Sequence, residues 1–242
     1  MSLFSGLPIG GVCDAMPQRF VTPLGELALT LSLSGVALER ADRIHALGQS
    51  GHIHSWLRPD CEVKLLLFSF SPALPEGMHV SAAIAAMWRV RASRRVDDLV
   101  FSCAWHGPTH FTEAGGPESG QWLDSLSWHD ARHKVAVGTE DGDCYAVRGR
   151  QNDWVPQRLI NRQDAPDKAV RQADWLELGY YRDDGFDIRL PALLPGEQFS
   201  CQFVCAWAPF TEDELATWFT VEQSPKALLA SLGLAADPSA SK

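Results

Sequence analysis

Short apolar runs, each broken by glycine or proline, are the feature that most constrains how this chain can fold. The 15 prolines and 19 glycines are spread along all 242 residues. Residues 27–33 read LALTLSL, with leucine on one parity and small or polar residues on the other. This alternation is typical of a strand with one buried face. Many short strands with closely spaced turns predict an all-β fold, a two-sheet antiparallel β-sandwich. We expect a single domain over residues 1–234 and a flexible tail over 235–242.

Four further runs predict strands of different character. Residues 63–70 are almost continuously apolar, which indicates a strand covered on both faces. Residues 80–91 and 99–105 flank a polar stretch, and this pattern favours a hairpin. Residues 199–207 form the last strong strand pattern.

Two Asp-Gly turns predict hairpins, because Asp-Gly accepts the positive φ that such turns require. The first would join residues 134–138 to 144–147, and the second would join 180–181 to 186–190.

Helical patterns are confined to the C-terminal part, where one or two short helices are expected. Thr211 is a predicted cap for a helix over 212–219, whose early acidic residues suit the positive end of a helix. Ser224 followed by Pro225 predicts the start of a second helix.

The charge balance bears on the partners and the compartment. Lys and Arg total 21 and Asp and Glu total 30, a formal charge of -9, which disfavours a nucleic acid or an anionic membrane as partner. No apolar run approaches the ~20 residues that span a bilayer. The start of the chain lacks the charge pattern of a signal peptide, so the six cysteines are expected as reduced thiols in a cytoplasmic protein.

Three segments together resemble a known family. Residues 5–11 (SGLPIGG) look like a Gly-(Val/Ile)-Pro-Leu-Gly-Gly opening motif, and residues 81–90 with 97–105 look like paired strands that end in a Trp element. Residues 194–197 (LPGE) with 203–209 look like a closing Pro-Gly-Glu strand. In this order they resemble the N-terminal β-sandwich domain of the family of bile-acid β-glucosidase, the non-lysosomal glucosylceramidase.

The resemblance implies a β-sandwich and a carbohydrate context. The family's catalytic carboxylates lie in a separate helical barrel domain, so no catalytic residue is carried over to this chain. We therefore predict a non-catalytic, carbohydrate-associated binding or accessory module without a cofactor, whose catalytic subunit would be a separate chain.

Nine tryptophans are the main compositional pointer to a binding surface, since indole rings stack on sugars and anchor protein interfaces. Three lie on apolar strands and are predicted core residues: Trp88, Trp105 and Trp207. Four lie in polar or turn-like surroundings and are predicted to stack on a ligand: Trp56, Trp122, Trp128 and Trp154. Asp141 and Asp184 would supply hydrogen bonds to hydroxyls. The carboxylate pairs Glu140–Asp141 and Asp183–Asp184 are otherwise explained as turn residues.

Two other functions stay open. A cytoplasmic immunity or assembly factor would use an acidic surface to bind a basic protein partner. A small metalloenzyme would use clustered imidazoles, because His-X-His with a third histidine can hold zinc, copper or iron. The metal candidates, which are otherwise loop and strand-end histidines, are His52, His54, His106 and His110.

Overall fold

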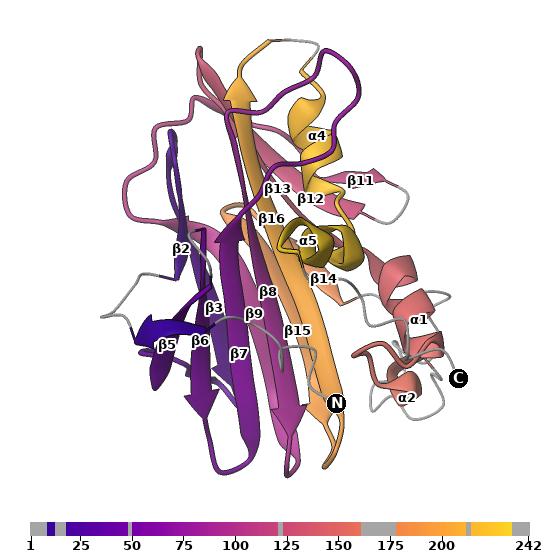
Figure 1. Ribbon diagram of the computed structural model, residues 1–242. Coiled ribbons are helices and arrows are strands. Elements are labelled where there is room, and N and C mark those ends of the chain that lie inside the picture. The colour runs from indigo at the N-terminus through magenta and orange to yellow at the C-terminus, as the bar shows by residue number, and fades with distance from the viewer. Residues whose placement is uncertain are drawn as a thin grey trace.

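A computed structural model describes residues 9–12, 18–47, 50–120, 123–160, 178–211 and 214–233, with the backbone alone for 9–12 and 119–120. Its strands form two antiparallel sheets packed face to face, the predicted all-β sandwich (Figure 1).

The larger sheet has ten strands in the order β1-β5-β6-β7-β8-β16-β13-β12-β10, with β11 also paired to β12. Their bounds are β1 (Ile9–Val12), β5 (Arg43–Leu47), β6 (Gly51–Leu57), β7 (Cys61–Ser69), β8 (Ala82–Ala92), β10 (Glu113–Ala114), β11 (Glu118–Gly120), β12 (Leu123–His129), β13 (His133–Glu140) and β16 (Gln198–Pro209).

The smaller sheet has six strands in the order β14-β15-β9-β3-β2, with β4 paired to β3. Their bounds are β2 (Arg19–Thr22), β3 (Gly25–Leu33), β4 (Val36–Ala37), β9 (Val96–His106), β14 (Gly179–Arg182) and β15 (Gly185–Leu193). The helices are α1 (Gly142–Arg150), α2 (Gln157–Ile160), α4 (Ala216–Val221) and α5 (Pro225–Ser231).

The main core lies between the two sheets and follows from strand parity. Leu27, Leu29 and Leu31 of β3 all face it and are almost fully buried, as the alternating pattern predicts. The opposite wall comes from the ten-stranded sheet and includes Trp88 of β8 and Phe203 of β16. Burial of these side chains is the main stabilising contribution to the sandwich.

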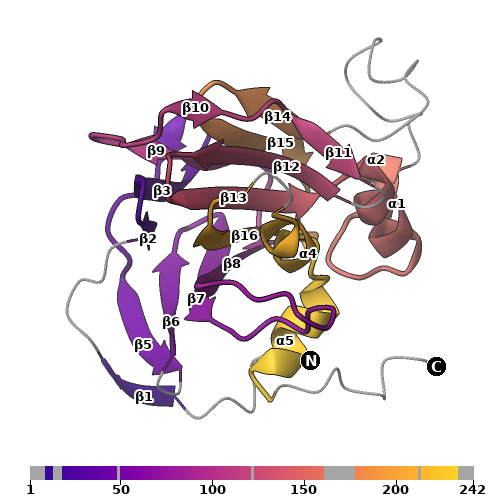
Figure 2. The same ribbon diagram turned by 90° about the horizontal axis from the view of Figure 1, so that it is seen from above.

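A second apolar cluster covers the other face of the ten-stranded sheet. Leu66 and Phe68 of β7 belong to it, whereas Val63 and Leu65 of the same strand face the main core. Both faces of β7 are therefore covered, as its continuous apolar run predicts. Val221 at the end of α4 and Leu228 of α5 close this second cluster, and Figure 2 shows both helices on this outer side of the sheet.

The hairpin predicted between residues 80–91 and 99–105 is wrong. β8 pairs with β7 and β16 in the larger sheet, whereas β9 pairs with β3 and β15 in the smaller one. The polar connection between them crosses from one layer to the other. Both a hairpin and a crossover place polar residues in solvent, so polarity alone does not separate them.

One of the two Asp-Gly hairpins is confirmed. β14 and β15 pair directly, with Arg182 opposite Gly185. A side chain at Gly185 would bring its Cβ within 2.0 Å of the Cys103 carbonyl oxygen on β9, so only glycine fits at this close approach.

The other Asp-Gly hairpin is wrong, because residues 144–147 lie in helix α1. Asp141 is the N-cap of this helix, and its side chain accepts a hydrogen bond from the Cys144 amide at 2.8 Å. The Asp-Gly pair thus begins a helix instead of turning a hairpin.

The two C-terminal helices are present, and one begins later than predicted. α5 begins as expected, with Ser224 as its N-cap and Pro225 in its first turn. α4 begins at Ala216 instead of following Thr211. The Glu214 carboxylate explains the shift, since it accepts hydrogen bonds from the amide and the hydroxyl of Thr217.

Candidate ligand pocket

An open pocket of about 420 Å³ lies on the outer face of the ten-stranded sheet, at the level where β13 ends. The sheet side includes Thr139 and Glu140 of β13 and Gln202 of β16, and the segment from Phe219 to Ala227 supplies the opposite side. The volume lies within the range of small-molecule sites.

Glu140 is the central titratable group of this pocket. Its side chain is 4% exposed, and Arg148 Nη1 donates to its Oε2 at 2.5 Å. Its other oxygen, Oε1, is buried and has no hydrogen-bond partner among the described residues. Burial raises the pKa of Glu140 to about 7, although the neighbouring Arg148 acts against this rise.

Gln202 is the second buried polar residue that lines the pocket. It is 3% exposed, and its Nε2 donates to the Gln223 carbonyl at 2.9 Å. Its Oε1 is buried and has no partner among the residues that the structure describes. Two residues that line one pocket, on neighbouring strands, thus each have a buried acceptor oxygen without a donor in the described part of the chain.

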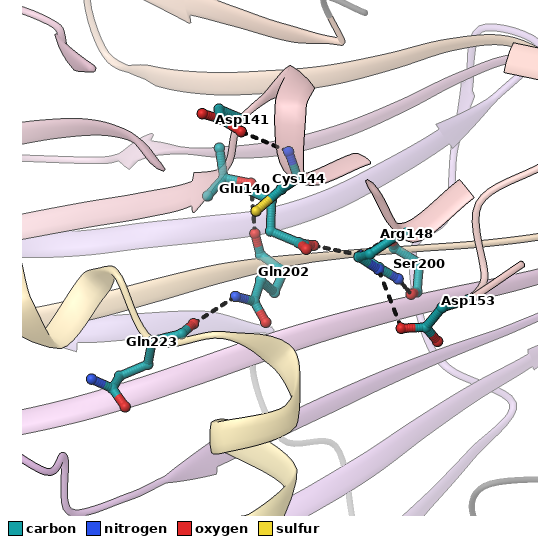
Figure 3. A network of polar contacts seen from close by, with 9 residues as sticks. Glu140, Asp141, Cys144, Arg148, Asp153, Ser200, Gln202 and Gln223 are labelled. Atoms are coloured by element: carbon teal, nitrogen blue, oxygen red, sulfur yellow. Dashed lines mark hydrogen bonds and ion pairs between the residues drawn. The ribbon is translucent and has the colours of Figure 1, made fainter. Parts of the chain in front are cut away.

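Arg148 anchors a polar network that continues away from the pocket (Figure 3). It donates to the Ser200 carbonyl at 3.2 Å and also to the Ser200 hydroxyl, and its Nε lies 3.7 Å from Asp153 Oδ2. These contacts hold the guanidinium beside Glu140, although Arg148 Nε has no hydrogen-bond partner among the described residues.

Cys144 also lines the pocket but is not an activated nucleophile. Burial, reinforced by the nearby Glu140 and Asp141, raises the pKa of its thiol to about 12. A thiol with such a pKa is protonated at neutral pH, and the thiolate is the reactive form.

Two of the predicted ligand-stacking tryptophans are core residues, so this part of the prediction is wrong. Trp56 is 0% and Trp128 is 1% exposed. Trp56 packs against Trp88 at 5.6 Å between ring centroids, and Trp128 packs against Trp105 at 5.1 Å. Their polar neighbours in the sequence suggest exposure, but both rings pack against residues of distant strands.

The remaining predicted ligand residues have other settings. Trp154 is half-buried, has a φ of 54°, and lies 4.5 Å from the Arg89 guanidinium. Trp122 lies outside the described residues. The Asp141 carboxylate caps α1, and both oxygens of Asp184 accept hydrogen bonds from Arg182. Of the predicted core tryptophans, Trp88 is fully buried, whereas Trp105 and Trp207 are only partly buried.

The four candidate metal ligands do not converge. His54 is fully buried on β6, and His52 on the same strand is half-buried. His106 and His110 are exposed, at and beyond the end of β9 in the other sheet. Within the described part of the chain, no three His, Cys, Asp or Glu side chains are grouped as metal ligands require.

His54 is an unusual feature of the main core. Both ring nitrogens are buried and lack hydrogen-bond partners among the described residues. Burial, with a smaller contribution from His52, lowers the pKa of His54 to about 4, so the ring is neutral at physiological pH.

Two further findings concern the cysteines and the helices. The described cysteines, Cys61, Cys103, Cys144, Cys201 and Cys205, carry free thiols. None of the described helices has the length and apolarity needed to span a membrane.

Sequence reasoning missed the pocket because it interpreted Glu140 as a turn residue. A usable signal lies in β16, where Ser200 and Gln202 share a face with the apolar Val204 and Ala206. Polar residues on such a face mark a place where the sheet is covered by something other than apolar side chains.

No family model and no curated protein matches this chain, so the glucosidase-family resemblance stays a prediction. One solved structure that is similar is a putative kojibiose phosphorylase from human microbiome, with a TM-score of 0.41 and 5% sequence identity. The likeness covers 93% of this chain and 28% of that one.

Proposed function

We propose that this chain is a non-catalytic binding module for a small hydroxyl-rich ligand, of which a saccharide is the leading class. The observation that carries this proposal is that two residues lining one pocket have buried acceptor oxygens without a described donor, Glu140 Oε1 and Gln202 Oε1. A buried acceptor without a donor costs about 1–3 kcal/mol, and ligand hydroxyls would remove that cost.

The rest of the lining suits the same ligand class. Phe219, Leu123 and Val221 present apolar surface beside the two acceptors. A sugar ring has both a C–H face that packs on such surface and hydroxyls that donate hydrogen bonds.

The protonated thiol of Cys144 supports binding over nucleophilic catalysis. The motif resemblance to a glucosidase sandwich domain adds a carbohydrate context.

Isothermal titration calorimetry with a panel of mono- and disaccharides tests this proposal. We expect Gln202→Met to weaken binding about tenfold, the cost of one ligand hydrogen bond. In the same variant, loss of the Gln202 Nε2 hydrogen bond to the Gln223 carbonyl opposes the gain from removing a buried unpaired oxygen, so the free energy of unfolding should change by no more than about 1–2 kcal/mol.

Gln198→Met is the matched control, since Gln198 lies on the same strand but outside the pocket lining. Binding of no saccharide in the panel, or equal binding by wild type and Gln202→Met, would contradict the proposal.

A further inference from the structure

The ionisable side chains that line the pocket are acidic or neutral. Glu140 and Glu222 contribute carboxyl groups, and Cys144 contributes a protonated thiol. No Lys, Arg or His is among the described residues of the lining. A cationic group on a ligand would therefore meet a complementary surface, whereas an anionic ligand would be repelled.

The Glu140 carboxyl can accept one more hydrogen bond, at a buried oxygen that a ligand would reach by displacing the side chains that cover it. Arg148 binds Oε2, and its other donors are directed to Ser200 and toward Asp153. Oε1 is left without a described donor, although it belongs to the same carboxyl group. A charge-assisted hydrogen bond to this oxygen is roughly twice as strong as a bond from a neutral hydroxyl.

Other charged or titratable groups near Glu140 come from several elements. Arg148, Tyr145 and Cys144 face it from α1, with Asp141 at the cap of that helix and Asp153 beyond its end. Cys201 approaches from β16, and Glu222 follows α4 at the pocket. Arg148 is the cation of this set, and it already contacts Glu140, Ser200 and Asp153.

We propose that the pocket selects a saccharide bearing a free amino group, whose ammonium binds Oε1 of Glu140 while ring hydroxyls donate to Gln202. This inference rests on the proposed function and narrows its ligand class. No covalent step is involved.

The proton balance follows from the state of Glu140. With a pKa near 7, the carboxyl is divided between protonated and ionised forms at neutral pH. An ammonium favours the ionised form, so binding at pH 7 displaces a fraction of a proton from Glu140. A neutral sugar does not favour the ionised form of Glu140 as strongly as an ammonium does.

The test compares four probes by calorimetry at pH 7: glucosamine, glucose, N-acetylglucosamine and ethanolamine. We expect glucosamine to bind about tenfold tighter than glucose or N-acetylglucosamine, and also tighter than ethanolamine. Titrations in two buffers of different ionisation enthalpy should show a net proton release that glucose lacks.

Two variants assign the effect to one carboxyl group. Glu140→Gln should reduce the preference for glucosamine over glucose to within about twofold and abolish the Glu140 share of the proton release. Glu39→Gln, which changes an exposed carboxylate outside the pocket lining, should keep the preference. A thermal unfolding curve for each variant shows whether it is folded.

The outcomes separate the two proposals. Equal binding of glucose and glucosamine would overturn the amine inference and leave the binding module intact. Ethanolamine binding as tightly as glucosamine would overturn the saccharide part of the inference. If no sugar binds at all, the proposed function itself fails. An unchanged preference in a folded Glu140→Gln variant would also overturn the inference.

Discussion

The two faces of the ten-stranded sheet bury polar groups in different ways. The inner face meets the second sheet through aliphatic and aromatic side chains. His54 is a neutral ring among them whose nitrogens have no hydrogen-bond partner within the described residues. The outer face beside α1 buries a charged pair, Glu140 and Arg148, within a hydrogen-bonded network (Figure 3). One sheet thus carries the main apolar core on one face and, on the other, a polar pocket beside a second apolar cluster.

The largest expected effect is on the outer face. Arg148→Met should lower the free energy of unfolding by about 3–5 kcal/mol, because Glu140 loses the cation that compensates its burial. The double variant Arg148→Met/Glu140→Gln should recover much of this loss. Denaturant unfolding measures both variants.

Arg58→Met is the control for this prediction, since Arg58 forms a partly exposed ion pair with Asp42 at 2.9 Å. That change should cost less than about 1 kcal/mol. Similar losses from Arg148→Met and Arg58→Met would remove the contrast between the buried network and the surface.

The inner face should lose stability in acid because of His54. Its pKa is lowered from 6.5 to about 4, so the unfolded chain binds this proton first as the pH falls. The stability that His54 contributes is present above pH 6.5 and is lost between pH 6.5 and 4, by up to about 3 kcal/mol. His54→Phe should flatten this part of a stability-against-pH curve.

His110→Phe is the control, since His110 is exposed. It tests whether removing any imidazole flattens the stability-against-pH curve. An unchanged acid slope in His54→Phe would contradict the assignment.

The outer face should respond to pH with the opposite sign. The pKa of Glu140 is raised from 4.5 to about 7, so the folded chain holds this proton longer as the pH rises. Stability should therefore fall between pH 4.5 and 7, by about 2–3 kcal/mol at most. Glu140→Gln should remove this decline, measured by thermal unfolding across that range. A decline that persists in the variant would assign it to other groups.

The smallest expected effect concerns Trp154, beside the outer network. Trp154→Leu should cost about 1 kcal/mol through loss of the contact with the Arg89 guanidinium. Denaturant unfolding measures the change. A loss as large as that of Arg148→Met would show that Trp154 is a core residue rather than a partly accessible one.

Local sequence patterns predicted the strands and their buried faces better than they predicted which strands pair in the sheets. The parity of residues 27–33 and the continuous apolar run of residues 63–70 both predict which faces are buried, because burial imprints a period of two on a strand. The layer change between β8 and β9 depends on pairing with β16 and β15 much later in the chain, and nothing in the connection encodes those partners.

The candidate site was less predictable for the same reason. Trp56 shares its strand with His52 and His54, so its surroundings look polar, yet its ring packs on Trp88 of another strand. From its sequence neighbours, Glu140 looks like a turn residue. In the structure Asp141 caps α1, and Arg148 near the end of the same helix donates a hydrogen bond to the Glu140 carboxylate. Contacts of this kind depend on the tertiary structure, which the local spacing of residues does not reveal.

The position of β16 has a consequence for how this chain is made. β16 lies between β8 and β13 in the sheet, although it follows both of them in the sequence. During synthesis β8 and β13 leave the ribosome before the strand that separates them exists, and each then presents an open edge. Open edges recruit strands from other chains, and pairing between distant segments closes slowly. We therefore expect the yield of folded protein in cells to depend on chaperone protection of these two strands until residues 198–209 have emerged.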